Sequence, residues 1–212
     1  GLLDKRLRLN AATFIYDYTN LQAQDSIANQ PIIRNVGKAE VRGAEVEFAA
    51  LLGSVFQLDG SVTYLDAVFT EGELTEPLRP APLTDEPGST LRNLDGLRLP
   101  RAPEWKMNIG AQADFAAFGG DLTLRADYAW QDQVFFTVFN INVASQDSYG
   151  VLRARATYAP GHGQYKVALF GENLTDETYF TNQILTGTTY GAEFVGSLGT
   201  PRTFGIELST QF

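Results

Sequence analysis

Cysteine is absent from this 212-residue chain, and histidine occurs once, at position 162. Without cysteine there is no disulfide framework and no thiolate metal site, and we expect neither a metal nor another cofactor. A Ser–His catalytic scheme would have to use His162, which stands in the turn-like sequence PGHGQ without a companion motif. We therefore interpret His162 as an exposed turn residue and predict that the chain is not an enzyme.

Long apolar runs and an excess of positive charge are missing as well. The apolar run FAALLGSVF covers only residues 48–56, whereas a transmembrane helix needs about 20 residues. The net charge of −9 gives the chain no electrostatic footprint for nucleic acid, so we expect no nucleic-acid partner. A membrane β-barrel is not excluded, because its strands alternate apolar and polar residues and dilute the hydropathy signal.

The chain does contain many segments in which apolar and polar residues alternate. In 105–115, for example, Trp105, Met107 and Ile109 alternate with polar residues or glycine, as in an extended strand with two different faces. We predict an all-β, antiparallel sheet of about eight strands. The predicted strands are 6–18, 39–51, 56–69, 105–115, 122–130, 150–158, 165–171 and 203–212.

One face of these strands carries charges at mid-strand, where a β-sandwich would bury hydrophobic side chains. We expect this face to meet a wet lumen or a polar plug. The predicted lumen-facing polar residues are Glu45, Glu47, Asp59, Lys106, Asp114, Arg125 and Asp127. The spacing of Glu45 and Glu47 also suits paired glycosidase carboxylates, but ion pairs with cations of the wall or plug are the simpler interpretation. A soluble antiparallel sheet with one solvated face alternates in the same way and stays as an alternative.

The predicted connections alternate in length. Tight turns are expected at 52–55, 117–121 and 160–164, and long loops at 19–38, 70–104, 131–149 and 172–202. Short turns on one side and long loops on the other are typical of outer-membrane barrels. Tyr64, Trp105, Tyr128 and Trp130 stand at the loop-side ends of their strands, as an interfacial aromatic girdle would. The pattern therefore favours a transmembrane β-barrel.

Three of the long loops contain candidate contact residues. Phe135, Phe136 and Phe139 lie in VFFTVF, and apolar residues in a loop are unfavourable in water. We predict that they bind a ligand, with inward folding over the lumen or an upward extension of the strands as alternatives. The acidic stretch 71–95 is interpreted as a solvated loop, or as a divalent-cation contact with lipopolysaccharide. Asn173 and Asp176 are expected to shape the chain's entry into the last loop.

Four stretches resemble the C-terminal barrel of TonB-dependent outer-membrane receptors. They are NVGKAEVRGAEVEF (35–48), GLRLPRAPEWKMNIG (96–110), ENLTDETYF (172–180) and GTPRTFGIELSTQF (199–212). The resemblance implies a 22-strand barrel with an N-terminal plug, energised by the TonB protein and importing a scarce nutrient, most often a ferric siderophore. It implies further that residues 1–212 are the C-terminal portion of that barrel, without the plug and earlier strands. Haem, cobalamin or an oligosaccharide as ligand would leave the same strand pattern.

The resemblance also gives the terminal strand a role. Phe204, Ile206, Leu208 and Phe212 share one face of TFGIELSTQF. In outer-membrane barrels such a strand is what the barrel-assembly machinery engages, and its apolar face afterwards meets lipid. The expected surroundings are therefore outer-membrane lipid and lipopolysaccharide. An outer-membrane β-barrel enzyme stays as a further alternative, with His162 as its required base.

Overall fold

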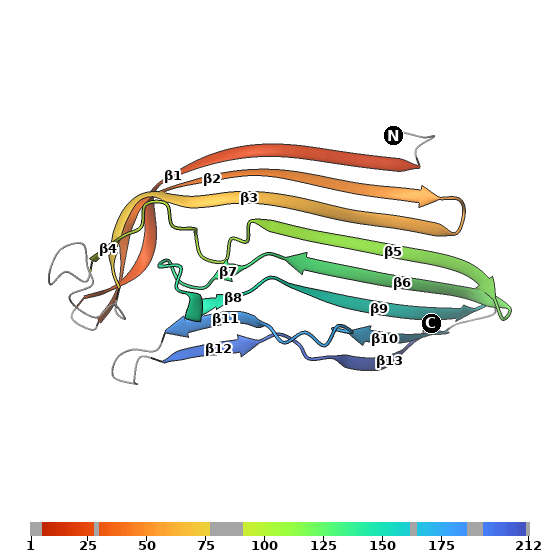
Figure 1. Ribbon diagram of the computed structural model, residues 1–212. Coiled ribbons are helices and arrows are strands. Elements are labelled where there is room, and N and C mark those ends of the chain that lie inside the picture. Colours follow the sequence, from red (N-terminus) through yellow and green to blue (C-terminus); the bar gives the residue numbers. More distant parts are fainter. Residues whose placement is uncertain (1–5, 28–29, 77–90, 162–164, 186–192, 211–212) are drawn as a thin grey trace.

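The computed structural model describes residues 6–27, 30–76, 91–161, 165–185 and 193–210. Eight long strands form one antiparallel sheet in which neighbours in the sheet follow each other along the chain (Figure 1). They are β1 (Leu7–Ile27), β2 (Gln30–Leu52), β3 (Phe56–Thr75), β5 (Trp105–Ala117), β6 (Gly120–Gln131), β9 (Tyr149–Pro160), β10 (Tyr165–Glu172) and β13 (Thr203–Thr210). The short β4 (Leu91–Asn93) pairs with the end of β3. The predicted all-β class and its eight strands are confirmed.

The strand register gives the sheet two chemically different faces. Residues that oppose each other in an antiparallel pair lie on the same face. We call the face with Leu124 the outer face and the face with Arg125 the inner face. Large apolar side chains stand exposed on the outer face of several strands, at Leu9, Val46, Val62, Ile109, Leu124, Leu169 and Ile206. No described part of the chain covers them, which disfavours the soluble binding module.

Aromatic pairs stand at both ends of the outer face. Tyr64 of β3 and Trp105 of β5 have ring centroids 4.8 Å apart on the long-loop side. Phe56 and Phe115, from the same two strands, meet edge to face at 6.2 Å on the opposite side. At ~3.4 Å per residue, the stretch from Phe56 to Tyr64 is about 27 Å long. The outer face is thus an apolar band between two aromatic borders, as in a membrane barrel.

Short turns join the strands at one end of the sheet (Figure 1). Residues 53–55 connect β2 to β3, and Phe118 and Gly119 alone connect β5 to β6. Both turn residues have left-handed backbone angles, with φ of +52° and +75°, as a type I′ hairpin turn requires. These two predicted turns are confirmed, whereas His162 of the third lies outside the described residues.

The predicted loops 19–38 and 70–104 are wrong in part, because much of each is strand. β1 and β2 continue as a paired ribbon as far as Ile27 and Gln30, and β3 continues to Thr75. The alternation weakens there because these strands bend, with register shifts after Tyr18 and Lys38. Gly37 and Gly72 are paired at the bend, and a Cβ on Gly37 would lie 1.8 Å from the carbonyl oxygen of Glu71. Only glycine permits this approach of the two strands.

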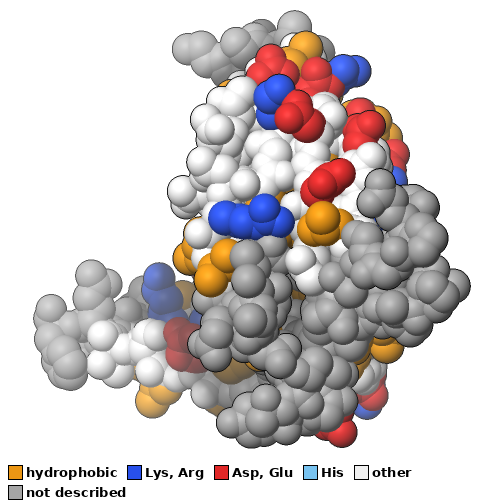
Figure 2. All heavy atoms as spheres, turned by 90° about the vertical axis from the view of Figure 1, so that its left-hand side faces the viewer, with side chains coloured by type: hydrophobic (Ala, Val, Ile, Leu, Met, Phe, Trp, Pro, Cys, Tyr) orange, Lys and Arg blue, Asp and Glu red, His pale blue; other side chains and the backbone are white. Residues whose placement is uncertain are grey.

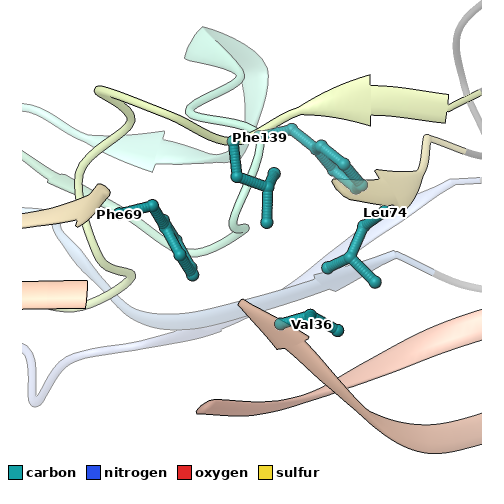
Figure 3. Close-up of a cluster of buried hydrophobic side chains, with 5 residues drawn as sticks. Val36, Phe69, Leu74 and Phe139 are labelled. Atoms are coloured by element: carbon teal, nitrogen blue, oxygen red, sulfur yellow. The ribbon is translucent and has the colours of Figure 1, made fainter. Parts of the chain in front are cut away.

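A hydrophobic cluster lies beside the bend (Figure 3). Its buried members are Val36, Phe69, Leu74, Leu94 and Phe139. They come from β2, β3, the segment after β4 and the 134–144 connection, so the cluster fastens four parts of the chain together. Beside it, Glu76 is buried and forms an ion pair with Arg92 at 3.0 Å. The interpretation of 71–95 as a solvated loop is therefore wrong in part: Glu71 and Glu73 are exposed but lie in β3, and Glu76 is buried.

The two later long connections also carry secondary structure. Residues 131–149 contain the paired strands β7 (Val134–Phe135) and β8 (Ser145–Gln146) and a 3₁₀ turn, η1 (Asn142–Ala144). Residues 172–202 contain the hairpin β11 (Phe180–Leu185) and β12 (Phe194–Leu198). No helix in the described ranges is long and apolar enough to cross a membrane.

Asn173 organises the turn that follows β10. Its side-chain amide donates to the carbonyl oxygens of Glu177 at 2.8 Å and Thr200 at 3.0 Å. Its Oδ1 accepts from the backbone N–H of Glu177 at 3.0 Å and from the Thr175 hydroxyl at 3.2 Å. Asn173 is buried and has a left-handed φ of +49°, which asparagine tolerates. This residue therefore fixes the chain between β10 and β13.

Candidate functional site

The inner face of the sheet carries a network of charged side chains that crosses strands. Arg125 of β6 donates to both carboxylate oxygens of Asp59 on β3, at 2.9 and 3.0 Å. It also donates to Asp127 of its own strand at 2.5 and 3.1 Å. β5 lies between β3 and β6, and it contributes Gly110 at this point. A Cβ there would lie 2.4 Å from Arg125 Nη2, so the missing side chain leaves room for the bridge.

Further ion pairs continue this network toward the last strand. Arg155 of β9 pairs with Glu207 of β13 at 3.0 Å and lies over the ring of Phe170 on the intervening strand. Arg153 pairs with Glu172 of β10 at 3.0 Å. These side chains are about half exposed, so their charges keep contact with water. An inner face of this kind suits an aqueous lumen or a polar protein surface.

The register places all seven predicted lumen-facing residues on the inner face, but it brings only three of them together. Asp59, Arg125 and Asp127 form the cross-strand bridge. Asp114 accepts instead from Thr123 and Gln112, and Glu47 accepts from Asn10. Glu45 and Lys106 share a row of the sheet, with Thr63 between them. Within the described residues, no group of three or more potential ligands is placed to hold a metal ion.

An aromatic ladder follows the inner face of β1 toward the long-loop side. Phe14, Tyr16 and Tyr18 stand on alternate residues, with ring centroids 5.4 and 6.4 Å apart. Tyr16 is 53% exposed and Tyr18 47% exposed, and they oppose the small or apolar residues Val41 and Ala39. We did not predict this ladder from the sequence, although the alternation of aromatic residues in ATFIYDY (12–18) is its signal.

A second aromatic pair stands on the inner face at the opposite part of the sheet. Tyr149 opposes Gln131, and its ring stacks on that of Tyr179 at 4.2 Å. A Cβ on Gly199 would overlap the Tyr179 ring, so glycine makes room for it. Nearby, Arg101 donates to Asn182 at 2.5 Å, which ties the β11–β12 hairpin to the segment before β5. Aromatic rings therefore occur on both sides of the inner face near the long loops.

The three predicted ligand-binding phenylalanines take different positions. Phe139 is only 9% exposed and belongs to the hydrophobic cluster, and its ring lies 6.0 Å from the Arg92 guanidinium. Phe135 and Phe136 are half-buried, and their backbone groups bond to Arg101 and Ala144. Contact of these phenylalanines with a ligand stays a prediction. Figure 2, viewed from the long-loop side, shows acidic and basic side chains together on this end of the molecule.

The apolar residues of the last strand stand on the outer face. Phe204, Ile206 and Leu208 are among the most exposed large side chains of the described chain. β13 pairs with β10 in the described sheet and forms one edge of it. Their role in assembly stays a prediction, and Phe212 lies outside the described residues.

Comparisons with known proteins identify the architecture. A family model described as "TonB dependent receptor-like, beta-barrel" matches residues 2–174. The fold is similar to the ferric yersiniabactin uptake receptor FyuA of Yersinia pestis, with a TM-score of 0.77, 20% identity, and 98% of this chain and 28% of that chain covered. It is also similar to the siderophore receptor PiuA of Acinetobacter baumannii, with a TM-score of 0.70, 21% identity, and coverage of 98% and 26%.

A third solved structure has the same arrangement of strands. The pyoverdine outer membrane receptor FpvA of Pseudomonas aeruginosa gives a TM-score of 0.64 at 19% identity and is matched by 99% of this chain over 28% of its own. The chain thus spans between a quarter and a third of the length of these receptors. No curated protein matches the chain in sequence. At these identities the likeness establishes the fold alone.

Proposed function

The chain belongs to the TonB-dependent receptor β-barrel family of the bacterial outer membrane, and we propose that it is part of an active importer of a ferric siderophore. The observation that carries the proposal is the match of residues 2–174 to the family's barrel. The likeness to receptors named for siderophores supports the choice of ligand. Import is energised by the TonB protein, and the proposal assigns a transport role without a catalytic step.

In this proposal residues 1–212 are the C-terminal portion of a longer receptor. A plug domain and the earlier strands then belong to chain outside these residues, and the TonB protein acts through the plug. The share of the solved receptors that the chain covers supports this arrangement. β1 and β13, which form the edges of the described sheet, pair with the other strands and close the barrel.

The two halves of the inner face suit two different neighbours. We call the long-loop end of the inner face the mouth. The ion pairs around Arg125 and Arg155 lie below it, where they meet water and the polar surface of the plug. The rings of Tyr16, Tyr18 and Tyr149 stand near the long loops, where they are available to stack on rings of the ligand. Phe135 and Phe136 contribute further contacts at this mouth, and Phe139 supports them from the hydrophobic cluster.

The outer face determines the remaining partners. Its apolar band contacts the acyl chains of the outer membrane, and the charged rim on the long-loop side meets lipopolysaccharide. Phe204, Ile206, Leu208 and Phe212 serve the barrel-assembly machinery before the barrel closes. Phe204, Ile206 and Leu208 support the proposal because an exposed apolar edge strand needs a partner until it is paired.

Iron-limited growth tests the function. The full-length receptor is expressed in a strain without siderophore receptors of its own, and uptake of radioactive iron is measured from hydroxamate, catecholate and mixed siderophores. We expect uptake from at least one of them, and its loss when the TonB protein is removed. Uptake from none of the ferric siderophores, with growth on haem or cobalamin instead, would contradict the choice of ligand.

The aromatic ladder of β1 allows a test of whether the inner face binds the ligand. Tyr16→Ser and Tyr18→Ser each remove one exposed ring, while Tyr165→Ser removes an exposed ring from the outer face as a matched control. A stacked ring contributes ~0.5–1.5 kcal/mol, so we expect affinity for the imported siderophore to fall about two- to tenfold per inner ring. Unchanged affinity in both inner variants would remove the ladder from the ligand site.

A further inference from the structure

Phe118 is the most exposed large hydrophobic residue in the described chain. It is 89% exposed and occupies the first position of the two-residue turn between β5 and β6. Its φ of +52° is left-handed, a conformation that glycine, asparagine and aspartate adopt with little strain and bulky residues rarely adopt. The turn thus exposes an aromatic ring to its surroundings. Asn–Gly is the preferred residue pair for such a turn, whereas this one has Phe–Gly.

The turn lies just beyond the aromatic border of the outer face. Phe115 is three residues before Phe118 and packs edge to face on Phe56. At ~3.4 Å per residue and the tilt of ~35–45° usual in these barrels, Phe118 is about 7–8 Å below that border. The headgroup layer of a bilayer is about 5–7 Å thick on each side of the hydrocarbon core. Phe118 therefore stands at the outer edge of the headgroup layer.

The backbone of the turn is held by a residue of the outer face. The hydroxyl of Tyr158 on β9 donates to the carbonyl oxygen of Phe118 at 2.8 Å. Tyr158 opposes Leu122 and Val167, which places it on the outer face with the apolar band. The outer face thus continues without interruption from Phe56 and Phe115, through Tyr158, to the turn.

We propose that Phe118 anchors the barrel in the headgroup layer of the periplasmic leaflet, with phospholipid as its partner. Three observations converge on this role: the exposed ring, its strained position in the turn, and its continuity with the lipid-facing surface. A ring in water would have no contact to offset the strain of the turn. A ring among headgroups and upper acyl chains would gain contacts that offset this strain. The anchor fixes how deeply the short-turn end of the sheet sits in the membrane.

The depth of the residue can be measured directly. Residues 1–212 contain no cysteine, so Phe118→Cys in the full-length receptor places a single nitroxide label within these residues. Asp121→Cys, on the inner face of the same hairpin, is the matched control. In vesicles of phosphatidylethanolamine and phosphatidylglycerol, we expect the label at 118 to collide several-fold more with oxygen, relative to a water-soluble nickel complex, than the label at 121. Equal ratios at the two positions would overturn the proposal.

A second pair of variants tests whether the ring contributes to anchoring. Phe118→Asn relieves the turn and removes the ring, and Phe118→Trp keeps an aromatic ring at the same place. We expect Phe118→Asn to lower the melting temperature of the vesicle-bound receptor by a few degrees and Phe118→Trp to leave it unchanged. If Phe118 were merely tolerated in the turn, Phe118→Asn would raise the melting temperature, because asparagine is the better residue for this turn. A higher melting temperature for Phe118→Asn in vesicles would therefore also overturn the proposal.

Discussion

The sheet has two regions that are stabilised in opposite ways. We call the part between the two aromatic borders the membrane band, and the ends of β1, β2 and β3 beyond the bend, with the segments packed on them, the extension. In the band, large apolar side chains point away from the protein, and Val46 of β2 is 42% exposed. Ten residues earlier in the same strand, Val36 is 5% exposed inside the hydrophobic cluster. One strand therefore serves two environments, with lipid taking the place of a protein core in the first and a compact cluster forming in the second.

The fully buried side chains show the same division. Phe69, Leu74, Leu94 and Asn173 are the largest of them, and all lie in strand ends or connections on the long-loop side of the sheet. Stability in the band thus depends on strand pairing and lipid, whereas the extension depends on packing as a soluble domain does.

The largest effect is expected from a cavity in the extension. Phe69→Ala removes a ring that is 1% exposed, and such truncations cost about 3–5 kcal/mol. Hydrogen exchange of the full-length receptor should show faster exchange in β4 and the 94–99 segment while β5 and β6 stay protected. Phe204→Ala is the control, since lipid fills the vacated space and no cavity remains. Faster exchange throughout the sheet would show that the two regions are not independent.

A charge in the band should have the next largest effect. Leu124→Arg places a guanidinium on the outer face, where the cost near the bilayer midplane is about 2–4 kcal/mol. Thr123→Arg, one residue away, points to the inner face beside Asp114 and should change the free energy of unfolding by less than about 1 kcal/mol. The measurement is denaturant unfolding in lipid vesicles. Similar losses in the two variants would mean that the faces are assigned wrongly.

The band was predictable from the sequence, whereas the extension was only partly so. A single rule, alternation toward lipid on one side and water on the other, governs residues such as Leu124 and Arg125, and it fixed all eight strands. At the bend, Gly37 and Gly72 interrupt the alternation, and the cluster of Phe69 with Phe139 depends on segments far apart in the chain. Likewise, the bridge from Asp59 to Arg125 needs the register of three strands, which no local pattern contains.

Loss of the Asn173 hydrogen bonds should have an intermediate effect. Asn173→Ala removes a buried side chain and its two part-buried hydrogen bonds to the carbonyl oxygens of Glu177 and Thr200. At about 0.5–1.5 kcal/mol for each bond, the cost is about 1–3 kcal/mol. Thr175→Ala, which removes an exposed hydroxyl from the same turn, should cost less. Heat-induced unfolding of the receptor in detergent, followed by its shift in electrophoretic mobility, measures both. Equal melting temperatures for Asn173→Ala and the unmodified receptor would contradict this role.

The smallest effect is expected from the ion pairs of the inner face. Asp59→Asn removes one carboxylate from Arg125, which keeps Asp127, and all three side chains are between 31% and 44% exposed. Half-exposed pairs of this kind contribute about 0–1 kcal/mol. Gly110→Ala disturbs the same bridge sterically, because its Cβ would displace the flexible end of Arg125. Both variants should therefore unfold in vesicles within about 1 kcal/mol of the unmodified receptor. A loss well above 2 kcal/mol in both would show that water does not reach this network in the assembled receptor, as when a plug domain covers it, because removing one partner of a shielded pair leaves a buried charge unpaired.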